Sequence, residues 1–119
     1  MPNLPARSRP AATPSAAEAI LAAIRAVPHG QVAGYGIIAK RAGLPGRARL
    51  VARVLAQNDD RGLPWHRILR SDGRIAFPPD SPGFAEQGQR LRAEGVDVRN
   101  GRVRMPREDS LDAAVWSPR

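Results

Sequence analysis

Cysteine is absent from the 119-residue sequence, and its absence excludes several classes of protein. A chain without thiols has no disulfide scaffold, no thiolate site for zinc or an iron–sulfur cluster, and no thiol that could accept a transferred group. Its two histidines, His29 and His66, lie too far apart in the sequence to form a metal site by themselves. We therefore expect neither a metal nor another cofactor.

Long hydrophobic runs are missing as well. No segment approaches the ~18 apolar residues of a membrane span, and the N-terminus has no apolar signal core. We therefore expect a cytoplasmic protein without membrane contact. The length fits one domain, and 42% hydrophobic with 25% charged residues is an ordinary globular balance.

Lysine is almost absent, because Lys40 is the only lysine among 19 basic residues. The formal net charge is +8 and is unevenly distributed: residues 20–78 hold ten bases and three acids, whereas residues 84–119 hold seven bases and six acids. A GC-rich genome would explain the excess of arginine but not this segregation. A basic surface on a small domain favours a nucleic-acid partner, so we expect an association with the nucleoid.

The chain divides into three predicted parts. Residues 1–14 hold four prolines, two arginines and no aromatic residue, which predicts a disordered basic tail. Residues 15–105 form the predicted folded domain. Residues 106–119 are predicted to be an irregular C-terminal tail.

Glycine and proline mark the expected helix ends and turns of the predicted domain. The pattern indicates helices over residues 15–27, 35–41, 47–57 and 84–94. The turn at residues 43–46 is typical of a helix-turn-helix. A hairpin-type turn at residues 71–73 separates two expected strands, 66–70 and 74–77, and Asn100-Gly101 is a second hairpin signal. These elements predict an α+β, winged-helix-like fold.

The third predicted helix has two distinct faces. At ~100° per residue, its branched aliphatic side chains should face the core: Leu50, Val51, Val54 and Leu55. The opposite face carries arginines among alanines and no acid, so the backbone can approach phosphates closely while arginine supplies the charge. We assign DNA contact to Ala48, Arg49, Ala52 and Arg53.

Three segments in register carry a resemblance: QVAGYGIIA at residues 31–39, PGRARLV at 45–51 and PWHRI at 64–68. Together they resemble the DNA-binding domain of O6-alkylguanine-DNA alkyltransferases, over roughly residues 15–105. The active-site motif of that family is Pro-Cys-His-Arg, and here Trp65 occupies the cysteine position. That substitution is characteristic of alkyltransferase-like proteins, which bind alkylated guanine in DNA without removing the alkyl group.

The resemblance implies roles for individual residues. Tyr35 matches a tyrosine that presses on the target phosphate and helps to rotate the nucleotide out of the stack. Arg49, which lies at the family's spacing from Tyr35, matches an arginine that enters through the minor groove and fills the vacated space. Asn58 matches a hinge between the recognition helix and the active-site loop. The expected lesion pocket consists of Tyr35, Leu55, Trp65 and Ile68.

The chemistry of the motif agrees with a binding protein. Alkyl transfer from guanine O6 needs a thiolate activated by a histidine that an acid orients. His66 and Glu94 resemble that histidine and acid, yet no nucleophile remains for them to activate. The indole nitrogen of Trp65 cannot accept a methyl group, because its lone pair belongs to the ring. We therefore expect no catalytic residue and no enzyme activity.

The sequence departs from the family pattern in one loop and leaves alternatives open. Some alkyltransferase-like proteins carry an arginine near the bound base where this chain has Pro78, within a proline-rich loop. A winged-helix transcription regulator is one alternative, and an enzyme that uses Asp72 or Glu94 as nucleophile is another. The resemblance implies a protein that binds double-stranded DNA containing O6-alkylguanine and passes the lesion to nucleotide excision repair through UvrA. We expect a monomer, because no dimerisation helix is visible in the sequence.

Overall fold

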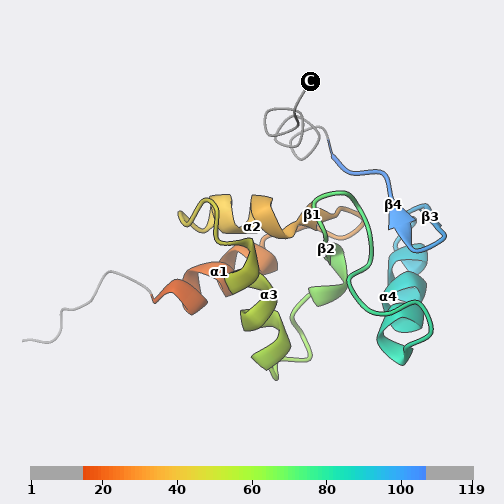
Figure 1. Ribbon diagram of the computed structural model, residues 1–119, viewed down its shortest axis with the longest axis horizontal. Coiled ribbons are helices and arrows are strands. Elements are labelled where there is room, and N and C mark those ends of the chain that lie inside the picture. Colours follow the sequence, from red (N-terminus) through yellow and green to blue (C-terminus); the bar gives the residue numbers. More distant parts are fainter. Residues whose placement is uncertain (1–14, 107–119) are drawn as a thin grey trace, which may run out of the picture.

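The computed structural model describes residues 15–106, and helices with short strands make up this part of the chain (Figure 1). The predicted tails, residues 1–14 and 106–119, lie outside the described residues apart from Pro106. The α+β prediction is confirmed. In chain order the elements are α1 (Ala16–Arg25), β1 (Ala33–Gly34), α2 (Tyr35–Arg41), α3 (Ala48–Gln57), the 3₁₀-helix η2 (Trp65–Arg67), β2 (Ile68–Leu69), α4 (Pro82–Ala93), β3 (Val98–Arg99) and β4 (Arg102–Val103).

The first helix begins at a capping box and ends earlier than predicted. The Ser15 hydroxyl accepts a hydrogen bond from the Glu18 backbone N–H at 3.1 Å, and the Glu18 carboxylate accepts one from the Ser15 N–H at 2.9 Å. The helix ends at Arg25 rather than at Val27. Pro28 explains the difference, because a proline disfavours helical geometry at the residue before it.

Helices α2 and α3 form the predicted helix-turn-helix. The bounds of α2 match the prediction, and Gly43 follows it with a left-handed φ of +81°. The connection is longer than predicted and spans residues 42–47, because Arg47 has non-helical angles and α3 starts only at Ala48. Val51 and Val54 of α3 are buried in the core formed with α1 and α2, as its helical periodicity predicts.

A strand, β2, lies within the predicted strand 66–70 and the turn at residues 71–73 is present, but no second strand forms over residues 74–77 to complete the predicted hairpin. The Gly73 N–H donates to the Arg70 carbonyl at 2.8 Å, and the Arg70 N–H donates to the Arg74 carbonyl at 3.0 Å. Before the turn, however, β2 pairs in parallel with β1, with Gly34 opposite Leu69. Both residues of β2 are buried, which suits a strand covered on two faces rather than an exposed hairpin.

The C-terminal part packs as a second core beside the first. Helix α4 starts at Pro82, two residues before the predicted start, because Ser81 accepts a hydrogen bond from the Phe84 N–H at 3.2 Å and so caps it. Strands β3 and β4 form the predicted hairpin, and Asn100 and Gly101 both have positive φ at its turn. The buried residues of this core are Val32, Leu69, Ile75, Leu91, Val98 and Val103.

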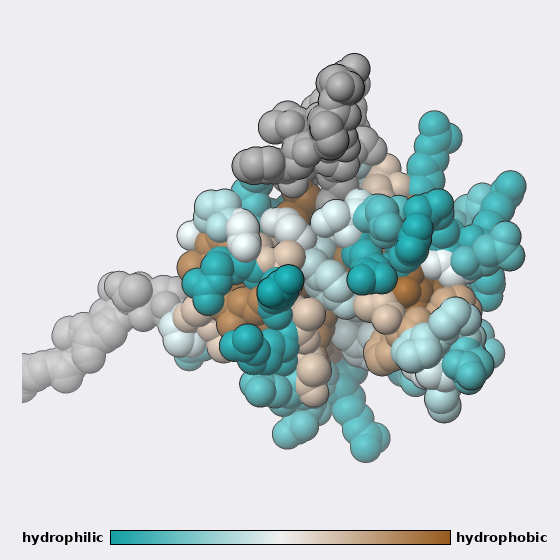
Figure 2. Space-filling view, in the orientation of Figure 1, coloured by the Kyte–Doolittle hydropathy of each residue, from teal (hydrophilic) through white to brown (hydrophobic). Residues whose placement is uncertain are grey.

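The two cores meet at the parallel pair, so α3 and α4 lie on opposite sides of β2 (Figure 1). On the face drawn in Figure 2, hydrophilic side chains project around the rim, and hydrophobic surface is visible only in small areas between them. Within residues 15–106, no helix has the length and apolar character needed to cross a membrane.

Candidate nucleic-acid interface

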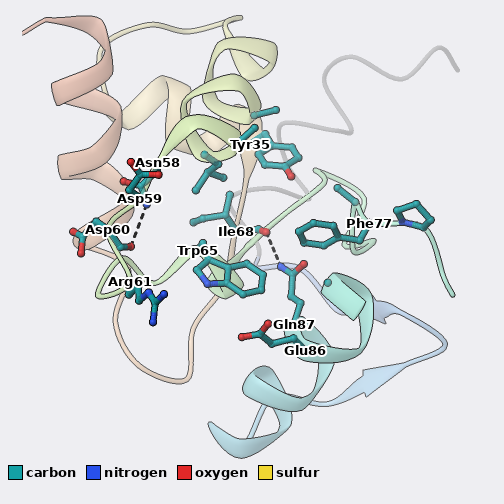
Figure 3. A pocket seen from close by; sticks show the side chains of 16 residues that line it. Tyr35, Asn58, Asp59, Asp60, Arg61, Trp65, Ile68, Phe77, Glu86 and Gln87 are labelled. Carbon is teal, nitrogen blue, oxygen red and sulfur yellow. Dashed lines mark hydrogen bonds between the residues drawn. The ribbon is translucent and has the colours of Figure 1, made fainter. Parts of the chain in front are cut away.

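A pocket of about 540 Å³ opens between α3, η2 and the start of α4 (Figure 3). All four side chains predicted for the lesion pocket line it: Tyr35, Leu55, Trp65 and Ile68. They come from three separate parts of the chain, and only the tertiary fold brings them together. The volume lies in the range of ligand pockets, which is roughly 300–1,000 Å³.

Trp65 forms a wall of this pocket and is not part of either hydrophobic core. Its ring meets the ring of Phe77 edge-on, with centroids 5.9 Å apart and planes at 84°. The guanidinium carbon of Arg90 lies 5.7 Å from the Trp65 ring centroid, in the range of a cation–π contact. Glu86 holds this arginine through a 2.8 Å ion pair. The indole is thus fixed from the α4 side.

Tyr35 stands at the start of α2, directly after β1. Because Gly34 pairs with Leu69, the next residues of the two segments, Tyr35 and Arg70, leave the strand pair on the same side. Burial raises the pKa of the Tyr35 hydroxyl, and the nearby Arg70 charge opposes this shift. The hydroxyl is therefore protonated at neutral pH and can donate a hydrogen bond to an anion.

The outer face of α3 adjoins the pocket. Ala52 lines the pocket itself, whereas Ala48, Arg49 and Arg53 line a neighbouring depression of about 450 Å³. Arg49 and Arg53 are exposed, and α3 carries no acid. The structure therefore brings the predicted pocket residues together and places the predicted arginines beside them, not among them.

The described arginines differ in whether a carboxylate pairs with them. On the hairpin side, Arg74 pairs with Asp72 at 3.3 Å and Arg99 pairs with Asp97 at 3.1 Å. Among the described residues, no ion pair with a carboxylate involves the arginines on α3, directly before it or beside Tyr35: Arg47, Arg49, Arg53 and Arg70. Within residues 15–106 no carboxylate compensates the charge of these four arginines, which favours a polyanion beside them. Arg61, Arg92 and Arg104 also have no carboxylate partner in this part of the chain.

A buried ionic network lies behind Trp65. The Glu94 carboxylate accepts hydrogen bonds from His66 Nε2 at 2.7 Å, from Arg67 Nη2 at 2.8 Å and from the Gly30 N–H at 3.0 Å. Arg67 also donates to the Val27 carbonyl at 2.9 Å. The network ties η2 to the end of α4 and to the loop after α1.

The network keeps Glu94 ionised. The hydrogen bond from Arg67 lowers the pKa of Glu94 far below its usual range, against the effect of burial, and Gly30 and His66 add to the lowering. A carboxylate only accepts hydrogen bonds, so His66 Nε2 carries the proton that bonds to it. His66 Nδ1 is buried without a hydrogen-bond partner among the described residues. The predicted contact between His66 and Glu94 is present, and Arg67 completes it.

The geometry does not support the alternative that the chain is an enzyme with Asp72 or Glu94 as nucleophile. Asp72 lies at the hairpin-side turn in ion pairs with Arg74 and Arg102, and Glu94 lies in the buried network. Neither residue lines the pocket. Over the described part of the chain, no cluster of three or more acidic, histidine or cysteine side chains could hold a metal ion.

Asn58, the predicted hinge, ends α3 and lines the pocket. Its side-chain amide donates to the Asp60 carbonyl at 3.1 Å, and Asp60 Oδ1 accepts from the Gly62 N–H at 2.9 Å. These bonds organise the loop that leads to η2. The hinge role itself stays a prediction.

Several residues that line the pocket were not predicted from the sequence, and Phe77 and Gln87 are two of them. Phe77 lies directly before the proline-rich loop and lines the pocket. The sequence feature that could have indicated this role is an aromatic residue next to Pro78. Gln87 is buried on α4 and donates to the carbonyls of His66 and Ile68, each at 3.0 Å. The sequence feature that could have indicated Gln87 is its spacing, because a residue four positions before the buried Leu91 lies on the same inner face of the helix.

Comparisons of the sequence and of the structure with known proteins both find DNA-binding proteins of the alkyltransferase type. A family described as "6-O-methylguanine DNA methyltransferase, DNA binding domain" matches residues 15–96. A DNA base-flipping protein of Vibrio parahaemolyticus is 41% identical over 80 residues, covering 66% of this chain and 78% of that protein. Alkyltransferase-like protein 1 of Schizosaccharomyces pombe is 36% identical over 77 residues, covering 64% of this chain and 71% of that protein.

Solved structures agree. S. pombe Atl1 in complex with damaged DNA containing O6-carboxymethylguanine superposes with a TM-score of 0.66 at 30% identity, covering 87% of this chain and 95% of that one. Mycobacterium tuberculosis OGT in complex with DNA superposes with a TM-score of 0.59 at 26% identity, covering 66% of this chain and 48% of that one.

Proposed function

The chain belongs to the family of the 6-O-methylguanine DNA methyltransferase DNA-binding domain, and from this premise we propose that it senses O6-alkylguanine in duplex DNA. It rotates the modified nucleotide into the pocket walled by Trp65 and holds it there. It is not an alkyltransferase enzyme, because the chain has no cysteine to accept the alkyl group.

The observation that carries the proposal is Trp65 itself. It occupies the motif position of the reactive cysteine, and it stands as an aromatic wall in a pocket next to a helix face whose arginines have no carboxylate partner within residues 15–106. An aromatic wall can stack against an extruded base or its alkyl group, but it cannot take the group over. The site is therefore suited to retention of the lesion.

Extrusion of the base follows from the chemistry of the lesion. The O6 substituent lies within the base stack, so the nucleotide must leave the stack before a pocket can enclose it. Unstacking costs a few kcal/mol, and the cost is smaller for a base that pairs poorly. In the proposal, Tyr35 presses on the target phosphate and Arg49 fills the gap in the duplex. Arg53, Ala48 and Ala52 contact the backbone.

The remaining steps extend the proposal beyond the chain itself. Since nothing is repaired, the bound DNA must be recognised by other proteins, and family resemblance points to nucleotide excision repair through UvrA. We propose a monomer, because the pocket and the arginine face belong to one chain. The proposed place of action is the nucleoid in the cytoplasm.

Competition between two duplexes of one sequence tests the proposal. One duplex contains O6-methylguanine and the other does not, and anisotropy measures the affinity of wild type for each. The wild-type protein should prefer the damaged duplex. Equal affinity for both would overturn the sensor, and a preference for one particular undamaged sequence would instead support a transcription regulator.

Two variants from the same helix face separate the assigned roles. Arg49→Ala should weaken the free energy of binding to the damaged duplex by about 1–3 kcal/mol, comparable to the loss of a stacking contact. Its effect on the undamaged duplex should be smaller. Arg53→Ala should weaken binding to both duplexes equally. It should also reduce the salt slope, which is the slope of log affinity against log salt concentration, by about one unit, as expected for a phosphate contact. Equal losses from Arg49→Ala on both duplexes would reduce Arg49 to a phosphate contact.

A further inference from the structure

The segment after the turn at residues 71–73 and the C-terminal hairpin form one small layer. Strand β4 lies in its middle and pairs with β3 on one side. On its other side, the Val103 N–H donates to the Gly73 carbonyl at 2.9 Å, and Arg74 forms an antiparallel bridge with Arg102. The layer is therefore held together by backbone hydrogen bonds on both sides of β4.

The two faces of this layer differ in character. Its inner face is apolar, because Ile75, Val98 and Val103 are buried in the second core. Successive residues of a strand point to opposite faces, so the sequence neighbours of these three residues lie on the outer face. Four of those neighbours are exposed arginines: Arg74, Arg99, Arg102 and Arg104.

Arg102 stands between two other arginines. It is opposite Arg99 on β3 and opposite Arg74 on its other side, and neighbouring strands lie about 4.8 Å apart. We call Arg74, Arg102 and Arg99 the arginine row. Like charges that lie directly opposite each other in a sheet are destabilising. An anionic ligand on the row would relieve this repulsion.

Two aspartates compensate the ends of the arginine row more closely than its centre. Asp72 and Asp97 pair with the two end arginines, at 3.3 Å and 3.1 Å, whereas Asp72 reaches Arg102 only at 3.9 Å. Arg104 follows Arg102 on the same face and has no carboxylate partner within residues 15–106. Both arginines line a depression of about 440 Å³. Their charges are the least compensated on this face.

The arginine row starts next to the proposed base-flipping site. Arg70 lies beside Tyr35, and its N–H donates to the Arg74 carbonyl at 3.0 Å. From Arg74 the row crosses to the hairpin, which lies at the α4 end of the molecule and away from α3 (Figure 1). Two strand spacings cover about 10 Å, and a duplex rises about 3.4 Å per base pair, so the row matches about three base pairs.

We infer that Arg102 and Arg104 bind backbone phosphates of the duplex that flanks the flipped nucleotide, on one side of it only. This inference rests on the proposed function, in which Tyr35 fixes the position of the target nucleotide. The arginine row leads away from Tyr35 in one direction, so the contact is asymmetric. DNA suits this surface because its closely spaced phosphates can neutralise several neighbouring arginines at once.

Duplexes with arms of different length test the asymmetry. The full duplex carries O6-methylguanine with about one helical turn of DNA on each side, and two shorter duplexes each have one arm cut to about two base pairs. Anisotropy titrations at several salt concentrations give the affinity and the salt slope for each. Wild type should lose more affinity and more salt slope when one particular arm is cut than when the other is cut.

A double variant assigns this difference to the hairpin. Arg102→Gln/Arg104→Gln should lower the salt slope by about two units, one for each phosphate contact, on both duplexes that keep the responsive arm. On the duplex that lacks this arm it should behave as wild type. The matched control is Asp97→Asn/Arg99→Gln, which removes an arginine of the same face together with its carboxylate partner. Its net charge is unchanged, so it should bind all the duplexes as wild type does.

Two further measurements separate a lost contact from a folding defect. Arg102→Gln/Arg104→Gln removes repulsion between opposite arginines, so its melting temperature should not fall below that of wild type. Asp97→Asn removes an acid from the depression and should act in the opposite direction, with tighter binding to the duplexes that keep the responsive arm.

The outcomes separate this inference from the proposed function. If wild type does not distinguish O6-methylguanine from guanine in the full duplex, the sensor proposal fails. If wild type recognises the lesion but Arg102→Gln/Arg104→Gln weakens binding to all the duplexes equally, the one-sided contact is overturned. No change on any duplex also overturns it, and is the result expected if an acidic protein segment covers this face instead. A loss confined to one arm, in a variant that melts normally, supports the inference.

Discussion

Replacement of Glu94 by glutamine tests whether the buried network now serves stability alone. Glu94 and His66 have side chains that are 9% exposed, and Arg67 is 16% exposed, so the three charges or dipoles interact with little solvent screening. Glutamine has nearly the same shape and retains one acceptor oxygen. It removes the negative charge, however, and leaves the Arg67 guanidinium buried without a counter-charge.

The expected loss of stability is large. Removing one partner of a buried ion pair costs about 3–5 kcal/mol, and the retained amide oxygen places this variant near ~3 kcal/mol. Since a domain of this size has a total unfolding free energy of about 5–15 kcal/mol, the protein should still fold. At about 4–8 °C per kcal/mol, the melting temperature should fall by roughly 12–24 °C.

The pH dependence identifies the group responsible. The pKa of Glu94 is lowered in the folded state, chiefly by Arg67, so its contribution is present above the unfolded pKa of about 4.3 and is lost as the pH falls below it. Each pH unit below ~4.3 should remove about 1.4 kcal/mol from wild type. Glu94→Gln has no such proton to bind. The stability difference between the two proteins should therefore shrink in acid.

Urea unfolding of both proteins at neutral pH and below pH ~4 measures this difference. Other carboxylates titrate in both proteins, so their effects cancel in the comparison. Binding of folded Glu94→Gln to matched duplexes should keep the preference for O6-methylguanine, because Glu94 does not line the pocket. A difference in stability that is constant with pH would refute the assignment to Glu94. Loss of lesion preference in the folded variant would refute a purely structural role.

Local signals in the sequence were sufficient for the helices and one hairpin. Helix α2 has the predicted bounds, and α3 begins one residue later than predicted. The Asn100-Gly101 turn forms as expected, because its conformation depends on positive φ at two adjacent residues. In each case the determining interactions lie within a few residues of one another.

Long-range pairing was beyond the reach of the sequence pattern. The parallel pair joins Ala33 to Ile68 across α2, α3 and η2, and no local feature of Ile68-Leu69 distinguishes it from a hairpin strand. The positions of Phe77 and Arg70 at the site could not be predicted for the same reason, because these residues reach the site only through the packing of β2 and α4. Arg67 belongs to the Pro-Trp-His-Arg motif, yet its bond to Glu94 depends on contact between η2 and the end of α4.

Two more substitutions probe the pocket and the arginine face. Trp65→Cys should not yield efficient methyl transfer from O6-methylguanine, because the small thiol loses the contacts to Phe77 and Arg90 that shape this wall; stoichiometric methylation in intact-protein mass spectra would contradict this. Arg70 and Arg74 flank one turn and form a matched pair. Arg70 lies beside Tyr35 without a carboxylate partner among the described residues, whereas Asp72 already neutralises Arg74 at 3.3 Å. Arg70→Ala should therefore weaken binding to damaged and undamaged duplexes alike and lower the salt slope by about one unit, while Arg74→Ala should change little. Equal effects of the two variants in salt titrations would show that an unpaired charge is not what selects the DNA-binding arginines.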